Sequence, residues 1–156
     1  MREYLDRVIG LDYQQLLHRN ADVQGLAFFL SAVQTGQIGL DDVAVDILSS
    51  NEFFASTGGS QSDWVDALYA RLLGRAPDPN GASFWTNELG SNALDQQQVA
   101  HMFVFSSEHF ASETVAWYEG LLNRVPTLSD VSQIVALLNA GANDEAALAR
   151  LLQMSG

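Results

Sequence analysis

The chain has 156 residues, of which 47% are hydrophobic and 17% are charged, and its formal net charge is −12 at pH 7. A chain of this length and apolar content forms one compact domain with a buried core and is not disordered. The strong negative charge excludes docking on nucleic acid or on an anionic membrane, because both would repel it.

Cysteine and lysine are both missing, and all seven basic residues are arginines. Without cysteine the chain cannot form disulfides, thiolate nucleophiles or Cys-ligated zinc sites. No stretch of about 18 apolar residues occurs, so no membrane insertion is expected. The first ten residues are charged and poor in apolar content, so we expect no N-terminal signal peptide in this chain.

An internal repeat dominates the sequence. Residues 69–110 repeat residues 13–54 at a shift of 56 positions without a gap, and a degenerate third copy begins at Tyr118. Each copy opens with the pattern Tyr-x-x-Leu-Leu-x-Arg. Repetition at this period is typical of one supersecondary unit stacked on itself. The prediction is a single all-α domain of three stacked helical units, the third degenerate or truncated, over residues 1–156 with units at 4–57, 62–111 and 112–156.

Each unit is predicted to contain three helices and a short closing helix. The first helix has apolar residues three and four positions apart, which places them on one face. In the second unit these residues are Val65, Leu68, Tyr69, Leu72 and Leu73. Ser62 and Asp63 are suitable N-caps for this helix, after a flexible linker at 56–62.

The turn after the first helix is clearest in the second unit. Pro77 cannot continue the helix, and Asp78 followed by Pro79 is the pattern of an N-cap with proline at the first helical position. Asp22 and Thr127 occupy the matching places in the other units.

The second and third helices are predicted to bury matching apolar faces. In the second unit these faces are expected to comprise Phe84, Trp85 and Leu89, and then Val99, Met102 and Phe103. For the third helix of each unit, an aspartate is the expected cap: Asp41, Asp95 and Asp144.

The joints between units differ. Ser50 and Ser106 are each followed by glutamate and aromatic residues, which is typical of a helix start. Seven residues are missing between the second and third copies, and only one glycine and no proline lie between Glu108 and Leu122. We therefore predict one longer helix that joins these two units.

Several residues are candidates for binding. Arg19, Arg75 and Arg124 end each first helix; they could hold an anion, or they could cap helix carbonyls and pair locally with an acid three residues later. Trp64 and Trp85 could stack on a sugar ring or a partner, or fill the core. Trp117, at the junction of the second and third units, could likewise bind a ligand or fill the core.

Metal binding is weakly supported by the sequence. Asp78 and Asn80 resemble part of a calcium loop, but the ligands stop at Asn80 where an EF-hand needs five or six, so a helix cap is the alternative. The histidines His18, His101 and His109 lack a convincing third ligand for zinc. Paired acids such as Asp41 and Asp42 fall at helix starts, where negative charge is stabilising. No serine–histidine–acid set, phosphate loop or dinucleotide fingerprint is present, so no enzyme activity and no catalytic residue is predicted.

The pattern Tyr69-x-x-Leu-Leu-Gly-Arg-Ala-Pro-Asp-Pro-Asn-Gly-x-x-Phe-Trp85, followed by Ser106-Ser-Glu-x-Phe110, resembles a bacterial family known as domain of unknown function forty-two fourteen. The resemblance covers almost the whole chain as tandem copies. The first unit departs from the pattern at His18 and Ala21, and the third has Thr127 in place of the aspartate. The family is distantly similar to the helical repeats of phycobilisome linkers.

The resemblance implies a function that the residues alone do not. The family occurs in secreted and surface-layer proteins, so it implies an extracellular or cell-surface, non-catalytic module. It would attach to glycan such as lipopolysaccharide or exopolysaccharide, with calcium as a possible cofactor. The alternative is a protein–protein linker or self-assembly module. On the glycan reading the expected ligand-binding residues are Trp64, Trp85, Arg75, Asp78 and Asn80.

Overall fold

The computed structural model describes residues 2–155, and every regular element within that range is helical. The elements of the first unit are α1 (Arg2–Asp12), η1 (Tyr13–Leu17), α2 (Val23–Gln34), α3 (Leu40–Leu48) and α4 (Asn51–Ser56). Those of the second unit are α5 (Gln61–Leu68), η2 (Tyr69–Leu73), α6 (Pro79–Gly90) and α7 (Gln96–Val104). The third unit comprises α8 (Ser107–Leu122), α9 (Leu128–Asn139) and α10 (Asp144–Ser155). The all-α prediction is confirmed.

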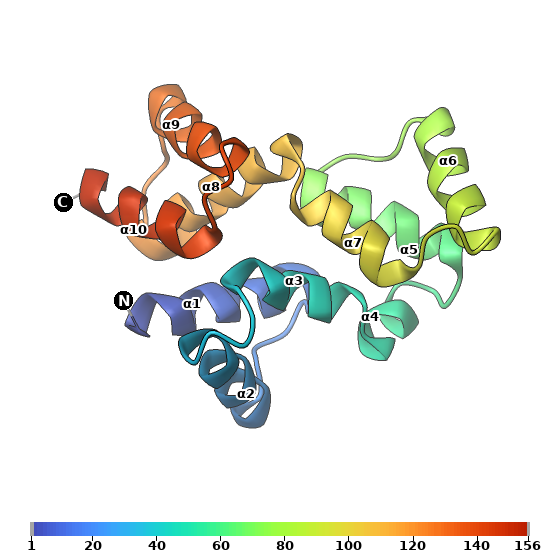
Figure 1. Ribbon diagram of the computed structural model, residues 1–156, viewed down its shortest axis with the longest axis horizontal. Helices are drawn as coiled ribbons and strands as arrows, with labels where there is room; N and C mark the ends of the chain where they lie inside the picture. The colour runs from blue at the N-terminus through green and yellow to red at the C-terminus, as the bar shows by residue number, and fades with distance from the viewer. Residues whose placement is uncertain (1, 156) are drawn as a thin grey trace.

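The units do not form an open row. The third helices of the first two units, α3 and α7, pack against each other, while α8 packs against η2 on one side and α1 on the other. The helix α10 also contacts α3, so the third unit returns to the first. Figure 1 shows α1 and α10 on the same side of the molecule, with the second unit on the opposite side.

The bridging helix was predicted correctly. Ser106 accepts a hydrogen bond from the backbone N–H of His109 and begins α8, which runs without a break through Leu122. Ser50 begins the short helix α4 in the same way. The boundary drawn at 111/112 therefore falls inside a helix that the second and third units share. None of the described helices is long and apolar enough to cross a membrane.

The first helices end in a way that the sequence did not indicate. In the first two units the last turn is π-helical, as η1 and η2, whereas α8 remains α-helical to its end. All three helices then stop at a residue in the left-handed region: His18 with φ 54°, Gly74 with φ 67° and Asn123 with φ 52°. This shared backbone position explains why such different residues occupy one place in the repeat.

Several predicted caps need correction. Asp22, Asp78, Asp95 and Thr127 cap their helices as expected. The cap of α5 is Ser60, not Ser62 or Asp63. The helix begins at Gln61, earlier than either predicted cap would allow.

The predicted caps of two third helices are also wrong. Gly39 is the N-cap of α3, and Asn143 accepts the N–H of Ala146 at the start of α10. Asp41 and Asp144 therefore lie inside helices, where both are buried.

Most residues on the predicted apolar faces form one continuous core, with three exceptions. Phe28 and Phe84, at matching places on α2 and α6, are 65% and 51% exposed, and Met102 is 47% exposed. Each was expected to be buried. The neighbouring ring of Phe29 or Trp85 takes the inward position instead, so the second helices show an aromatic residue to solvent.

Candidate functional site

The repeated motif forms a set of mutual contacts that we call the tyrosine bracket; in the second unit it comprises Tyr69, Arg75, Gly81, Trp85 and Glu108. The Arg75 guanidinium lies over the Tyr69 ring, 5.1 Å from its centroid. Its Nε and Nη2 donate to Glu108 Oε2 at 2.7 Å and Oε1 at 3.1 Å. These hydrogen bonds hold the pKa of Glu108 below its usual value. The arginine therefore joins the first helix to the start of α8.

The glycine in the motif provides space for the tyrosine hydroxyl. Asp78 accepts the N–H of Gly81, which fixes the first turn of α6. A Cβ at Gly81 would lie 2.6 Å from the Tyr69 hydroxyl oxygen, too close for any side chain. The indole Nε1 of Trp85 donates to the same hydroxyl at 3.2 Å. The bracket thus ties together three helices.

The first unit repeats the bracket except at one place, where Phe29 replaces Trp85 and its ring has no N–H to donate to the Tyr13 hydroxyl. Arg19 lies 5.1 Å from the Tyr13 centroid and makes the same paired hydrogen bonds to Glu52. Gly25 faces the Tyr13 hydroxyl as Gly81 faces that of Tyr69.

The third unit keeps only part of the bracket. Arg124 lies 4.9 Å from the Tyr118 centroid. Its acidic contact is Asp130, at 3.8 Å, in place of a glutamate. All five members of the bracket are therefore present only in the second unit, the first unit lacks the indole, and the third keeps the tyrosine and the arginine.

The local acid pairs predicted for Arg19 and Arg75 are present, at 3.5 Å to Asp22 and 3.9 Å to Asp78. The stronger partners, Glu52 and Glu108, were missed. Each glutamate lies 33 positions after its arginine, so a search for charges recurring at one offset within the repeat would have found them.

A small hollow beside the bracket in the second unit is the candidate binding site, and we call it the unit-two hollow. It has a volume of about 180 Å³ and is lined by Tyr69, Leu73, Arg75, Trp85, Met102, Phe103, Ser106 and Glu108. The Trp85 and Phe103 rings lie 5.1 Å apart, and Phe84 packs edge-on against Trp85 at 4.9 Å. Exposed Phe84 and Met102 extend the apolar surface at its rim.

The hollow brings together two of the five candidate binding residues, Arg75 and Trp85. Trp64 lies elsewhere: it is fully buried, and its indole donates to the carbonyl of Leu48 at 2.9 Å. Asp78 and Asn80 lie at the start of α6, where Asp78 is engaged as a cap and Asn80 is exposed.

The first unit has different residues at these positions. Phe29 stands where Trp85 stands, and it is only 8% exposed. Asp46 replaces Met102, and Ile47 replaces Phe103. The brackets are alike, but the accessible tryptophan and its apolar rim belong to the second unit.

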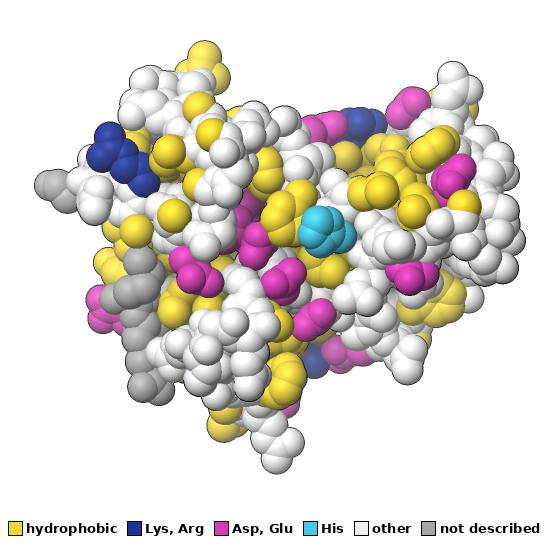
Figure 2. All heavy atoms as spheres, viewed as in Figure 1, with side chains coloured by type: hydrophobic (Ala, Val, Ile, Leu, Met, Phe, Trp, Pro, Cys, Tyr) yellow, Lys and Arg dark blue, Asp and Glu magenta, His cyan; other side chains and the backbone are white. Residues whose placement is uncertain are grey.

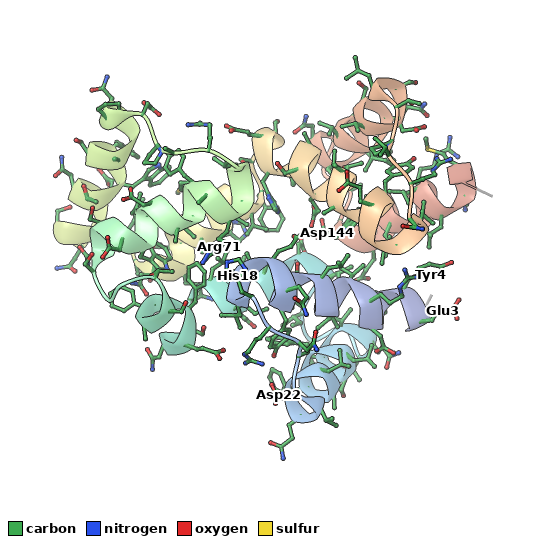
Figure 3. The ribbon with its side chains drawn as sticks, turned by 180° about the vertical axis from the view of Figure 1, so that it is seen from behind. Glu3, Tyr4, His18, Asp22, Arg71 and Asp144 are labelled. Atoms are coloured by element: carbon green, nitrogen blue, oxygen red, sulfur yellow. The ribbon has the colours of Figure 1, made fainter. Side chains whose placement is uncertain are left out.

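A larger cavity lies where the first helices of all three units meet, and we call it the central cavity. Its volume is about 340 Å³, and it is lined by residues of α1, η1, α3, η2 and α8, including Asp12, His18, Arg71, His109, Glu113 and Trp117. Figure 3 shows Arg71 and His18 together near the end of α1, seen from behind. Two buried atoms at this cavity, Arg71 Nε and Glu113 Oε2, have no hydrogen-bond partner. Trp117, only 2% exposed, forms part of its wall.

The histidines lie in three different surroundings. His109 is buried and its Nδ1 lies 3.1 Å from the carbonyl of Leu72, so Nδ1 carries the proton and donates it. Burial lowers the pKa of His109 and favours the neutral ring. His101 stacks on Phe105 on the surface of α7. Within residues 2–155, no three His, Asp or Glu side chains are placed to hold a metal ion.

Comparison with known proteins yields one family. The family model described as "Domain of unknown function (DUF4214)" matches residues 6–57 and 44–113, two overlapping copies that agree with the tandem repeat. No curated protein matches the sequence.

Proposed function

The chain belongs to the DUF4214 family, and from that premise we propose that it is a non-catalytic module that binds glycan outside the bacterial cell. The unit-two hollow carries this proposal, because it combines an accessible indole with a planar guanidinium–carboxylate pair. A sugar ring has an apolar C–H face that packs on an aromatic ring, and its hydroxyls bond to charged planar groups at the edge.

The arrangement of the hollow is suited to holding a ligand without reacting with it. Arg75 and Glu108 bond to each other through two hydrogen bonds, so neither is a free acid or base. Their outer edges remain available, with side chains 44% and 46% exposed. Because the bracket fixes both groups before a ligand arrives, little ordering entropy is lost on binding.

The test is a glycan array containing lipopolysaccharide and capsular or exopolysaccharide fragments, with and without calcium, followed by titration calorimetry of any hit. Trp85→Ala is expected to weaken binding by about 10- to 30-fold, as for other central aromatic contacts. Trp85→Phe, which copies Phe29 of the first unit, should weaken it less. A matched control is Phe29→Leu, which alters the counterpart position and should leave affinity unchanged. No binding across the panel in the presence of calcium would contradict the proposal.

The alternative is a linker or self-assembly module. It is favoured by Phe28 and Phe84, which expose aromatic surface at matching places on α2 and α6. Light scattering over a wide concentration range would show a rising mass that Phe28→Ser with Phe84→Ser abolishes. A constant monomer mass would count against self-assembly and leave glycan binding as the proposal.

A further inference from the structure

Four acids lie where the third unit closes on the first, two of them buried and two half-buried. This acid cluster comprises Asp12 of α1, Asp41 of α3, Glu113 of α8 and Asp144 of α10, one residue from each of four helices. Asp41 and Asp144 are 9% and 3% exposed, and Asp12 and Glu113 line the central cavity. Figure 3 places Asp144 between the C-terminal helices and α1. Figure 2 shows acidic side chains gathered where α3 and α10 approach each other.

The repeat itself does not require these acids. The position of Asp12 is occupied by Leu68 and Trp117 in the other units, and all three side chains face the interior. Asp12 therefore stands at a place that the other two units fill with apolar side chains.

The same comparison can be made for Glu113 and Asp144. The position of Glu113 is occupied by Val8 and Trp64, which are 3% and 0% exposed. Asp144, as the first residue of its helix, matches Leu40, which is 1% exposed, and the half-buried Gln96. An acid at such a place costs stability unless it is neutral or paired.

The charges that raise the pKa values of the cluster are negative, and Arg71 lies in the same central cavity as Asp12 and Glu113. Burial raises the pKa of Asp12 and of Glu113 well above their usual values, and the pKa of Asp144 to about 7. Burial also raises the pKa of Asp41, and Asp42 and Glu145 add further repulsion. Asp144 is also among the negative charges that raise the pKa of Glu113.

The basic groups on the same elements bond across the seam between the first and third units, line the central cavity or, like Arg150 of α10, are exposed. Arg7 of α1 donates to the carbonyls of Gly120 and Leu121, near the C-terminal end of α8. Arg71, His18 and His109 line the central cavity.

Other contacts besides the cluster also join the third unit to the first. Glu145 accepts the N–H of Leu40 at 3.2 Å, which links α10 to the start of α3. The remaining contacts are those of α1 with α8 and of α3 with α10. The cluster lies on this seam, and two of its members, Asp12 and Glu113, also line the central cavity.

We propose that the acid cluster is a proton-controlled latch: while its carboxyls retain protons it holds the third unit against the first, and their loss separates the two units. The closed form binds more protons than the open form. Raising the pH therefore favours opening, and acid favours closure.

The absence of cysteine allows a direct test. Spin labels on Gln24→Cys in α2 and Gln133→Cys in α9, both on exposed residues, report the distance between the two units. We expect this distance to be longer at about pH 9 than at about pH 5. In Asp12→Asn/Glu113→Gln/Asp144→Asn, which keeps the side-chain shapes but cannot ionise, it should stay at the short value at both pH values.

Two results would overturn the latch: one distance at both pH values in the native chain, or an equal lengthening in the triple variant. A control variant, Glu3→Gln/Asp66→Asn/Glu119→Gln, removes three exposed acids and should still open, which separates the cluster from general charge repulsion. If the triple variant does not fold, hydrogen exchange of the native chain decides. Protection in α10 should fall with pH relative to α6, and equal changes in both helices would refute the latch.

Discussion

The arginine of each repeat shows how a charged motif residue acts mainly as a structural connection. Arg19 and Arg75 both lie on a tyrosine ring and pair with a glutamate 33 positions later. The ion pairs are exposed and screened by salt, so they add little to the free energy of unfolding and act mainly by orienting the helices. They set the angle between the first helix and the helix that carries the glutamate.

The glycine of the bracket offers a test at the scale of one residue. Gly81→Ala is expected to destabilise the protein by about 1–3 kcal/mol, because its Cβ would overlap the Tyr69 hydroxyl. Gly10→Ala is the matched control: it lies within α1 with no atom near its Cβ position, so it should stabilise by about 0.5–1 kcal/mol. Urea unfolding measures both, and a neutral Gly81→Ala would refute the steric role.

The bracket acid predicts a dependence on pH. Because the pKa of Glu108 is lowered in the folded state, its stabilising effect is present above the unfolded pKa and is lost as the pH falls through the folded value. Glu108→Gln should therefore remove part of the acid sensitivity of unfolding below about pH 4. Unfolding curves that coincide in shape at every pH for the two proteins would contradict this.

Among the elements, the helix ends were the least predictable from sequence. The periodicity located the first helices, and the single helix from Ser107 to Leu122 followed from the absence of breakers. The caps of α3 and α10 were misplaced, because an acid near a helix start was taken as the cap when Gly39 and Asn143 fill that place.

The candidate site was predictable only in part. Trp85 and Arg75 were predicted as binding residues and both line the unit-two hollow, but Glu108 was not predicted, because its partnership with Arg75 spans 33 positions of the chain. The exposed positions of Phe84 and Met102 depend on how α6 and α7 rotate against each other. Helical spacing alone does not fix that rotation.

The left-handed residues at the helix ends predict opposite changes in stability for two substitutions. Gly74→Ala places a Cβ at φ 67° and should destabilise by about 1–2 kcal/mol. His18→Gly relieves the same strain at φ 54° and should stabilise by a similar amount. Thermal unfolding of both variants checks this, and two shifts of the same sign would contradict the shared backbone role.

At the scale of the molecule, the three units close into a compact body, and four acids lie at the closure. Because these carboxyl groups lie close together and are poorly solvated, they lower the free energy of unfolding at neutral pH. Because Asp22, Glu108 and Asp130 have lowered pKa values and the cluster has raised ones, stability should be highest near about pH 4–5.

Replacing three acids of the cluster with apolar residues from matching places in the repeat tests whether these acids lower the stability at neutral pH. Asp12→Leu/Glu113→Val/Asp144→Leu should increase the free energy of unfolding at pH 7 by on the order of a few kcal/mol, and should flatten its decline above about pH 5. Urea unfolding across the pH range is the measurement. A less stable variant, or an undiminished decline, would show that the acids are not the cause.

The claim that the second unit binds glycan is tested most directly by the three tryptophan indole N–H signals in a proton–nitrogen NMR spectrum. Trp64 and Trp117 are buried and serve as internal references, while Trp85 lines the unit-two hollow. Titration with a glycan fragment selected from the array should shift the Trp85 signal and leave the other two in place. A shift confined to Trp64 or Trp117, or binding that leaves all three unchanged, would contradict the assignment of the site.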